Sequence, residues 1–496
     1  MDSKNNQIAD EEKTPQEANT PPVDGHQVLI DELRDYRAQM ALGGGEARIK
    51  AQHDKGKLTA RERVLRLLDE GTFVEIEGFM THRQTDFGLD KEHFLGDGIV
   101  SGFGKINGRM VCIYSQDFTV LGGSFSEVAG QKLSRLLDKA MQAGIPIIGI
   151  NDGGGARIQE GVYSLGAFGE LFYRNSIASG VVPQISIQLG PCAGGAVYSP
   201  GLMDFIIMAK GLGNMYITGP EVIKTVTGEE VDMETLGGAM THSSVSGVCH
   251  FVSESEDDAL AMTRALLSYL PSNNSEPAPA VQSTDDPWRM DSELNSIIPL
   301  ETTTAYDMKD VIAHVFDRGT FMEVHANFAQ NAIVGFARLY GQVVGIVAQQ
   351  PLVLSGAIDI NAADKMARFI RFCDAFNIPL ITFMDSPGFL PGVTQEHGGI
   401  IRHGAKIVYS YSEATVPKIT IITRKGYGGA MVVMGSKNIH TDFVFAWPSA
   451  EIAVMGAEGA VSILYRKELK AMENPAVERA RLVSEYRDRF SKPYRT

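Results

Sequence analysis

Residues 144–155 have the sequence GIPIIGINDGGG, an apolar run that ends in an aspartate and three glycines. The run follows a helical pattern over residues 126–143, and it is typical of a strand buried on both faces of a parallel sheet. A second such run covers residues 181–189 and is followed by PCAGGA at 191–196. This order of strand, glycine-rich turn, helix and strand predicts βαβ units with helices covering the sheet.

The second half of the chain repeats the first. DEGTFVE at 69–75 matches DRGTFME at 317–323 with an offset of 248 residues. The segments that end the two central strands recur later with offsets of 233 and 234 residues. The smaller offsets place about fifteen extra residues in the first half, near residues 81–97. A period this long indicates a duplicated domain rather than a solenoid, so we predict an α/β protein with two tandem domains of one fold.

Local composition divides the chain further. We expect a disordered tail (1–26), an N-terminal domain (27–270), a linker (271–304) and a C-terminal domain (305–496). The linker begins with PSNNSEPAP, which is rich in turn-forming residues. Near the start of the N-terminal domain we expect helices over residues 27–42 and 46–53, with Thr59 as the N-cap of the helix that follows.

Composition also narrows the class of protein. The 496 residues are 44% hydrophobic and 21% charged, as in ordinary globular proteins. A net charge of −15 disfavours binding to nucleic acid or to an anionic membrane surface. No run approaches the roughly 20 apolar residues of a membrane helix. The four cysteines are far apart, and CxxC and HExxH motifs are absent, so we expect no metal site and a cytoplasmic protein.

Four glycine-rich segments follow the expected central strands and are the candidate ligand-binding segments. They cover residues 151–157, 190–196, 385–392 and 426–430. Glycine lets the backbone approach a ligand, and free N–H groups at a helix start bind an anion. That anion could be a phosphate or the oxyanion of an enolised thioester. The alternative is a set of tight turns that bind nothing. The sequence does not match GxGxxG, GxxxxGK[ST] or GxSxG motifs.

Charged side chains near these segments each have two interpretations. Arg157 and Arg424 could bind a phosphate or carboxylate, or could form internal ion pairs. Lys57, Arg61 and Arg63 form a basic cluster that could meet CoA phosphates, although we expect a solvated helix face.

Two further side chains invite a catalytic interpretation that we do not favour. Cys192 lies beside a glycine-rich segment, but no histidine or asparagine partner is evident, so we expect a small buried residue. The pair Glu396 and His397 could act as acid and base, but we expect a loop without a catalytic role.

Longer motifs carry a specific resemblance. They are GKLTARER at 56–63, GARIQEG at 155–161, GPCAGGAVYSP at 190–200, PGFLPG at 387–392, GGIIRHGAK at 398–406 and AWPSAEIAVMGA at 446–457. From about Gln27 to the C-terminus, the chain resembles the carboxyltransferase β subunits of acyl-CoA carboxylases. It is most similar to the propionyl-CoA carboxylase β group, and the methylmalonyl-CoA decarboxylase and carboxytransferase chains are close relatives.

The resemblance implies two ClpP/crotonase-like domains and three face-to-face dimers that form a homo-hexamer. Each active site would lie between the N-terminal domain of one chain and the C-terminal domain of another. Acyl-CoA would bind the first, and biotin, carried by a partner biotin carboxylase or carrier subunit, would bind the second. The implied activity moves a carboxyl group from carboxybiotin to the α-carbon of propionyl-CoA or acetyl-CoA. The cofactor would supply the base, so neither a catalytic side chain nor a metal would be required.

The resemblance also implies roles for individual residues. The amides of Gly194 and Gly195 would hold the thioester oxyanion, and those of Gly429 and Ala430 would hold the biotin ureido oxygen. The other implied site residues bind substrate (Gly154, Gly155, Ala156, Arg157 and Val432) or cofactor (Gly388, Phe389 and Gly428). In the family, the residue two positions after the second Gly-Gly-Ala motif, which is residues 428–430 here, lines the acyl pocket. That residue is Val432 in this chain, and propionyl-CoA carboxylases often have Asp there.

Some positions depart from the family pattern. Gly153-Gly154 replaces a usual Ser-Gly, Gln349 replaces Asn, and Ala357 replaces Cys. The chain ends with KPYRT at 492–496, where family members continue, so we expect a C-terminal domain shortened at its end.

Three alternatives to the carboxylase interpretation stay open. The first is a methylmalonyl-CoA decarboxylase or transcarboxylase subunit. The second is a CoA hydratase or isomerase on the same fold, for which no carboxylate pair is identified. The third is a non-catalytic structural subunit, which a shortened end would favour.

Overall fold

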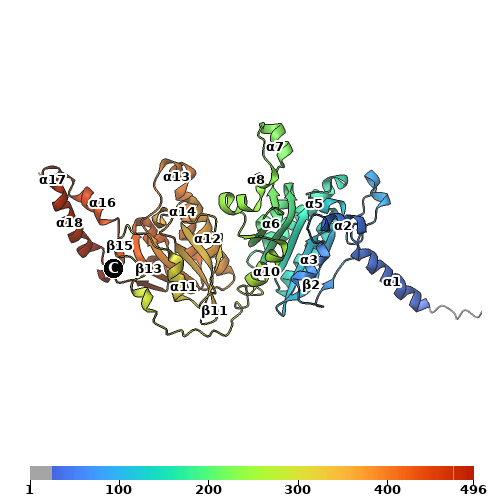
Figure 1. The fold of residues 1–496 in the computed structure, drawn as a ribbon, viewed down its shortest axis with the longest axis horizontal. Coiled ribbons are helices and arrows are strands. Elements are labelled where there is room, and N and C mark those ends of the chain that lie inside the picture. The colour runs from blue at the N-terminus through green and yellow to red at the C-terminus, as the bar shows by residue number, and fades with distance from the viewer. Residues whose placement is uncertain (1–24, 473, 496) are drawn as a thin grey trace, which may run out of the picture.

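The computed structural model describes residues 25–472 and 474–495, which form two lobes lying side by side (Figure 1). Most of the expected disordered tail lies outside the described residues, and Gly25 and His26 begin the first helix. The segment expected as a linker passes along one side of both lobes (Figure 1). The domain bounds that the sequence suggests stay a prediction.

An eight-stranded sheet forms the centre of the first lobe. Its strands are β1 (Val74–Glu75), β2 (Ile99–Ile106), β3 (Arg109–Gln116), β4 (Ile147–Gly153), β5 (Gln184–Ala193), β6 (Phe205–Ala209), β7 (Asn214–Tyr216) and β8 (Phe251–Ser253). The hydrogen-bonded order is β1-β2-β3-β4-β5-β6-β8, with β7 paired to β5. β1, β2 and β3 pair antiparallel, and all pairings from β3 onward are parallel.

A seven-stranded sheet repeats this arrangement in the second lobe. Its strands are β9 (Met322–Val324), β10 (Ala332–Leu339), β11 (Gln342–Gln349), β12 (Leu380–Ser386), β13 (Lys418–Tyr427), β14 (Phe443–Ala446) and β15 (Glu451–Ala453). The order is β14-β13-β12-β11-β10-β9, with β15 paired to β13. β9 to β15 therefore take the places of β1 to β7, so the predicted α/β architecture with two tandem domains is confirmed.

Strand register agrees with the offsets in the sequence. Ile147 pairs with Gln184, and Leu380 pairs with Lys418, at offsets of 233 and 234 residues. The predicted insertion lies between β1 and β2. Glu75 pairs with Gly102 in the first lobe, whereas Glu323 pairs with Gly335 in the second, so the first connection is 15 residues longer. It contains a short 3₁₀ segment, Asp86–Lys91.

Helices cover both faces of each sheet (Figure 1). Those of the first lobe are α1 (Gly25–Ala41), α2 (Glu46–His53), α3 (Ala60–Leu67), α4 (Glu127–Ala143), α5 (Val162–Ala178), α6 (Tyr198–Leu202), α7 (Pro220–Thr227), α8 (Met233–Gly237), α9 (Ala239–Thr241) and α10 (Glu256–Leu267). Those of the second are α11 (Met308–Val315), α12 (Ile360–Ala375), α13 (Val393–Gly398), α14 (Ile400–Glu413), α15 (Gly428–Val433), α16 (Ala457–Leu464), α17 (Arg466–Lys470) and α18 (Pro475–Phe490). None of these described helices is long and apolar enough to span a membrane.

The helix ends follow local sequence signals. Thr59 caps α3 as predicted, and it forms a capping box because Thr59 accepts from the Glu62 amide while Glu62 accepts from the Thr59 amide. Gly144 ends α4 in the left-handed conformation with φ of 62°, which glycine adopts without steric cost. These two signals fix where α3 begins and where the chain turns into β4.

One buried lysine braces the turn between the first strands of each lobe. Lys132 of α4 donates to the carbonyls of Gly96 and Ile99, at 2.9 and 2.6 Å. Its counterpart Lys365 of α12 donates to four carbonyls, including that of Ala332 at 2.7 Å. Burial lowers the pKa of Lys132 to about 8 and that of Lys365 to about 7. The two lobes thus share this lysine and its hydrogen bonds to backbone carbonyls, as well as the order of strands.

The lobes share one apolar core across their junction. Phe205 of β6 contacts Phe372 of α12 edge-on, with ring centroids 4.7 Å apart. Polar contacts reinforce this packing, since Arg338 of β10 donates to the Ser268 carbonyl at 2.7 Å and the Tyr269 hydroxyl donates to the Thr320 carbonyl at 2.6 Å. These aromatic and hydrogen-bond contacts fix the position of one lobe relative to the other.

Candidate active site

The four glycine-rich segments lie at the carboxyl ends of equivalent strands. β4 and β5 end next to the first two segments, and β12 and β13 end next to the other two. β4 pairs in parallel with β5, and β12 with β13. The carboxyl ends of neighbouring parallel strands lie at the same edge of a sheet, where α/β proteins bind ligands. Each lobe therefore has one such edge lined by two glycine-rich segments.

The first segment of each lobe is fixed by an isolated backbone bridge. Phe125 pairs with Ala156 in the N-terminal lobe, and Ile358 pairs with Phe389 in the C-terminal lobe. The glycine before each bridge, Gly155 or Gly388, has a φ of 98° or 137°, which other residues rarely adopt. The implied substrate residues Gly154 to Arg157 thus correspond to the implied cofactor residues Gly388 and Phe389, one set in each lobe.

The second segment of each lobe begins a short helix. Gly194 and Gly428 have φ of 64° and 58° and start these turns. The first N–H groups of a helix have no acceptor within it. A Cβ added to Gly195 would meet no atom within 4 Å. One added to Gly429 would meet only the Phe389 ring, at 3.7 Å. Both helix starts therefore have room for an oxygen atom of a ligand.

A buried ion network lies behind the first segment of the N-terminal lobe. Asp152, at the end of β4, has no exposed surface. Its Oδ2 accepts from Arg63 Nη1 at 2.8 Å and pairs with Lys57 Nζ at 2.7 Å. Arg63 is also fully buried, and its Nη2 donates to Glu256 Oε1 at 2.6 Å. The expectation of a solvated helix face was therefore wrong for Lys57 and Arg63, because both neutralise a buried carboxylate.

The third member of that basic cluster is also paired. Arg61 Nη1 lies 2.7 Å from Glu75 Oε2, and both side chains are largely covered. The cluster as a whole therefore holds α3 and the segment before it against the sheet. Asp152 and Glu256 lie 89 and 193 residues from Arg63, and Glu75 lies 14 residues from Arg61, so none of these pairs shows as a helical spacing in the sequence.

The C-terminal lobe has the same buried carboxylate with different cations. Asp385, at the end of β12, accepts from Arg424 Nε at 3.0 Å and pairs with Lys425 Nζ at 3.5 Å. Arg424 Nη1 also donates to the Thr304 carbonyl at 2.6 Å. Of the two interpretations of Arg424, the structure supports the internal ion pair.

A glutamine supports the carboxylate-bearing residue in both lobes. Gln116 Oε1 accepts from the Asp152 amide at 3.0 Å, and Gln349 Oε1 accepts from the Asp385 amide at 3.2 Å. Gln349 was noted in the sequence as a departure from the family pattern. In this chain it has the same contact as its counterpart, so the two lobes agree with each other at this position.

Arg157 is internal as well. Its side chain is fully buried, and Nη1 lies 2.6 Å from Asp97 Oδ1 and 3.2 Å from Glu160 Oε1. Its Nη2 donates to the Ser124 carbonyl at 3.1 Å. The guanidinium thus braces the 154–157 segment from inside the lobe, and a contribution of this segment to binding comes through its backbone.

The remaining candidate side chains differ in accessibility. Val432 is on α15 and 41% exposed, so it lies on an accessible face next to the helix start. Cys192 is 2% exposed, and burial raises its pKa to about 12, so it is a neutral thiol and fits the expected small buried residue. Glu396 and His397 are exposed on α13, so the expectation of a loop was wrong, because residues 393–398 form a short helix.

The second segment of the C-terminal lobe has a support that the sequence did not reveal. The Tyr427 hydroxyl, next to Gly428, donates to Glu451 of β15. Glu451 Oε1 in turn lies 3.0 Å from Arg487 Nε of α18, and the Ile452 amide donates to the Ser491 carbonyl at 2.9 Å. The last helix is therefore connected to the helix start at Gly428. Tyr427 directly precedes the glycines, and this position was its only sequence signal.

No group of three or more His, Cys, Asp or Glu side chains in residues 25–472 and 474–495 is arranged to hold a metal ion.

Comparison with known proteins identifies the family model that fits this chain. The model described as "Carboxyl transferase domain" matches residues 51–496. A propionyl-CoA carboxylase carboxyltransferase subunit of Haloferax mediterranei is 57% identical over 465 residues, covering 94% of this chain and 90% of the relative. A methylmalonyl-CoA decarboxylase α subunit of Veillonella parvula is 54% identical over 469 residues, covering 95% of this chain and 91% of the relative.

Solved structures agree with the sequence comparison. A crystal structure of the transcarboxylase 12S hexamer, described as having methylmalonyl-coenzyme A and methylmalonic acid bound, superimposes with a TM-score of 0.92 at 51% identity. The match covers 96% of this chain and 91% of the transcarboxylase chain. The range matched by the family model, residues 51–496, contains all four glycine-rich segments.

The Asp152 network predicts a large stability effect for Arg63. We expect Arg63→Met to lower the free energy of unfolding by about 3–5 kcal/mol, because it leaves buried carboxylates without their shared cation. The control is Arg66→Met on the same helix. Arg66 pairs with Asp257 at an exposed site, with side chains 52% and 69% accessible, so we expect at most about 1 kcal/mol. Denaturant unfolding measures both, and equal effects would contradict the proposed role of the network.

A second prediction concerns the glycine that faces this carboxylate. A Cβ at Gly190 would overlap Asp152 Oδ1, so we expect Gly190→Ala to destabilise the protein by about 1–3 kcal/mol. Gly195→Ala, a few residues further on, adds its methyl group to open space and is expected to leave the unfolding midpoint almost unchanged. If Gly190→Ala were as stable as Gly195→Ala, Asp152 would not be tightly held.

Proposed function

Because the chain belongs to the carboxyl transferase domain family, we propose that it is the carboxyltransferase subunit of a biotin-dependent acyl-CoA carboxylase acting on propionyl-CoA. The observation that carries this proposal is the pair of glycine-led helix starts, one per lobe, at the carboxyl ends of the equivalent strands β5 and β13. Two such sites match a reaction in which two carbonyl-type oxygens gain negative charge. The propionyl-CoA carboxylase relatives, at 53–57% identity, support the substrate class.

The acyl-CoA part of the reaction belongs to the N-terminal lobe. Loss of the α-proton turns a thioester into an enolate, whose oxygen carries the negative charge. The Gly194 and Gly195 amides would donate to that oxygen, and preorganised donors of this kind stabilise the transition state. The backbone of Gly154, Gly155 and Ala156 would line the bound acyl-CoA, with Arg157 bracing the segment from within.

The biotin part belongs to the C-terminal lobe. When bound, biotin carries the carboxyl group and supplies the base that the reaction needs. The Gly429 and Ala430 amides would donate to its ureido oxygen, and the open space beside Gly429 fits that oxygen. Gly388, Phe389 and Gly428 would form the wall around it. Tyr427, Glu451 and Arg487 would keep this helix start in position.

Val432 is the proposed determinant of the acyl chain. It lies on α15, the helix that begins at Gly428, and is partly exposed. A single methylene is worth only about 1–3 kcal/mol in an apolar pocket. We therefore propose that propionyl-CoA is preferred over acetyl-CoA by no more than about 200-fold.

We also propose an assembly and a location. The transcarboxylase structure is described as a hexamer, which supports a homo-hexamer of three dimers with each active site shared between two chains. The biotin would arrive on a partner carboxylase or carrier subunit. A cytoplasmic location is supported by the four cysteines, all of which are buried free thiols.

A second function is favoured by the comparisons. The decarboxylase α subunit at 54% identity and the transcarboxylase structure at 51% identity cover nearly the whole chain. A methylmalonyl-CoA decarboxylase or transcarboxylase subunit would use the same two helix starts. The partner subunits that co-purify with the chain distinguish these complexes from a carboxylase.

The proposal predicts a reaction that needs no partner. The purified chain, mixed with free biotin and methylmalonyl-CoA or malonyl-CoA, should remove the carboxyl group from the CoA ester. Mass spectrometry of the CoA products measures the loss, and a sample without biotin is the control. Biotin-dependent loss, faster for methylmalonyl-CoA, is expected. Loss that is independent of biotin, or no loss from a hexamer that binds CoA, would contradict the proposed function.

A matched pair of variants tests the helix start itself. Gly195→Ala places a methyl group where the thioester oxygen would lie, so we expect the rate to fall by about 100-fold or more while the fold is kept. The control Gly201→Ala also adds a methyl group to open space, but on α6 and beyond the helix start. Its activity should stay within about 2-fold of the parent's, given the small cost of such a change. Equal activity of the two variants would remove Gly195 from the site.

A further inference from the structure

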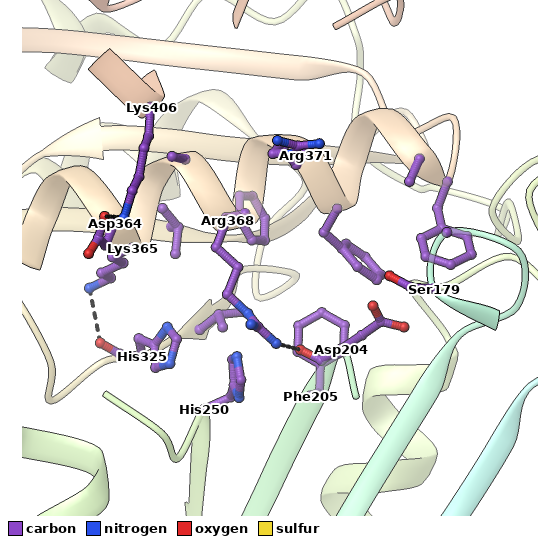
Figure 2. A pocket seen from close by; sticks show the side chains of 18 of the residues that line it. Ser179, Asp204, Phe205, His250, His325, Asp364, Lys365, Arg368, Arg371 and Lys406 are labelled. Atoms are coloured by element: carbon purple, nitrogen blue, oxygen red, sulfur yellow. Dashed lines mark hydrogen bonds and ion pairs between the residues drawn. The ribbon is translucent and has the colours of Figure 1, made fainter. Parts of the chain in front are cut away.

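An open cavity of about 840 Å³ lies between the two lobes and is separate from the glycine-rich segments. None of the site residues named above lines it among the described residues. Its walls come from the loops around β6, β8 and β9 and from helices α12 and α14 (Figure 2). A cavity of roughly 300–1,000 Å³ is large enough for a small organic ligand.

The cavity is cationic although the chain is acidic. Five lysine and arginine side chains and only two carboxylates line it, whereas the chain as a whole has a net charge of −15. The cations are Lys365, Arg368, Arg371, Arg402 and Lys406, and the carboxylates are those of Asp204 and Asp364. Lys365 is occupied by backbone carbonyls, Lys406 pairs with Asp364 and Arg371 pairs with Glu413. Among the described residues, Arg368 and Arg402 have no carboxylate partner, so they are the cations most open to a ligand. Clustered positive charge in a concave site attracts anions.

His250 contributes a buried donor to this cavity. Its Nδ1 accepts from the Ile206 amide at 3.1 Å, so the proton of the neutral ring is on Nε2. Burial lowers the pKa of His250 well below its usual value, which keeps the ring neutral. Nε2 has no hydrogen-bond partner among the described residues, and the residue is only 6% exposed. A buried donor without an acceptor costs about 1–3 kcal/mol, so a ligand atom is the natural acceptor here.

Arg368 reaches the same place from the other lobe. Its Nη2 donates to the carbonyls of Met203 and Asp204, at 2.8 and 3.3 Å. These are the only hydrogen bonds of its guanidinium within the described residues, so Nε and Nη1 remain available. Figure 2 shows this side chain extending from α12 toward His250 and Asp204. Donors from both lobes therefore converge on one point.

We propose that this interlobe cavity binds a small organic anion, with its phosphate or carboxylate group held between the Arg368 guanidinium and His250 Nε2–H. The apolar part of the ligand would contact the Phe205 and Phe372 rings, which also line the cavity. Burial raises the pKa of Asp204 to about 7, so near neutral pH this carboxylate opposes an anion only in part. A bound anion would connect the N-terminal lobe to the C-terminal lobe and stabilise their arrangement.

The proposal is tested by calorimetric titration of the assembled protein with three probes: inorganic phosphate, adenosine 5′-monophosphate and succinate. At least one should bind at millimolar concentration or below, with one site per chain. Saturating CoA should not displace it, because the active site is elsewhere. Tighter binding of the phosphates or of succinate identifies which anionic group the cavity takes. Absence of binding by all three probes, or displacement by CoA, would overturn the proposal.

Variants locate the site. We expect Arg368→Met to weaken binding by about 10-fold or more, since hydrogen bonds to charged groups are among the stronger ones. The Lys406 side chain is half-exposed and contacts Asp364 Oδ1 at 2.7 Å and His403 Nδ1 at 3.4 Å. Lys406→Ala should weaken binding by a smaller factor, and it keeps the test valid if Arg368→Met fails to fold. Lys467→Ala on α17, outside the cavity, is the control and should bind normally. Binding unchanged in both cavity variants would contradict the proposed site.

Discussion

Both lobes bury a carboxylate at the carboxyl end of a central strand, and the glycine-rich segments depend on how that charge is neutralised. Asp152 and Asp385 have no exposed surface, and an isolated buried carboxylate would be costly. Each is paired with two cations and positioned by a glutamine that binds its amide. The backbone after the aspartate is thereby fixed, and with it the segment that leads toward the ligand.

The two lobes neutralise the buried carboxylate with cations from different secondary-structure elements. In the N-terminal lobe they are Lys57, which precedes α3, and Arg63, which is on α3. In the C-terminal lobe both are on β13. Position 190 is the counterpart of position 424. The different source of the cations explains why position 190 is glycine and position 424 is arginine. Asp152 occupies the space beside Gly190, whereas Asp385 is reached by the Arg424 side chain from that same strand position. Both copies of the duplicated fold therefore have the buried aspartate, but the cations that pair with it differ.

The repeat in the sequence was sufficient to predict the tandem sheets, the strand ends and the positions of the glycine-rich segments, because these depend on local pattern. The ion network was not predictable in this way. Arg63 lies 89 residues from Asp152 and 193 from Glu256 along the chain, and the charged run Arg61-Glu62-Arg63 on a helix has the pattern of a solvated face. The interlobe cavity was missed for the same reason, since His250 and Arg368 meet only after both lobes have folded and packed.

The central claim is that the two glycine-led helix starts are matched donor sites, one for the thioester oxygen and one for the biotin oxygen. A crystal structure of the chain with an acyl-CoA analogue and free biotin tests it directly. We expect the thioester oxygen to lie about 3 Å from the Gly194 and Gly195 amides, and the ureido oxygen to lie at a similar distance from the Gly429 and Ala430 amides. A thioester or biotin bound away from these amides, with the helix starts facing only solvent, would contradict it.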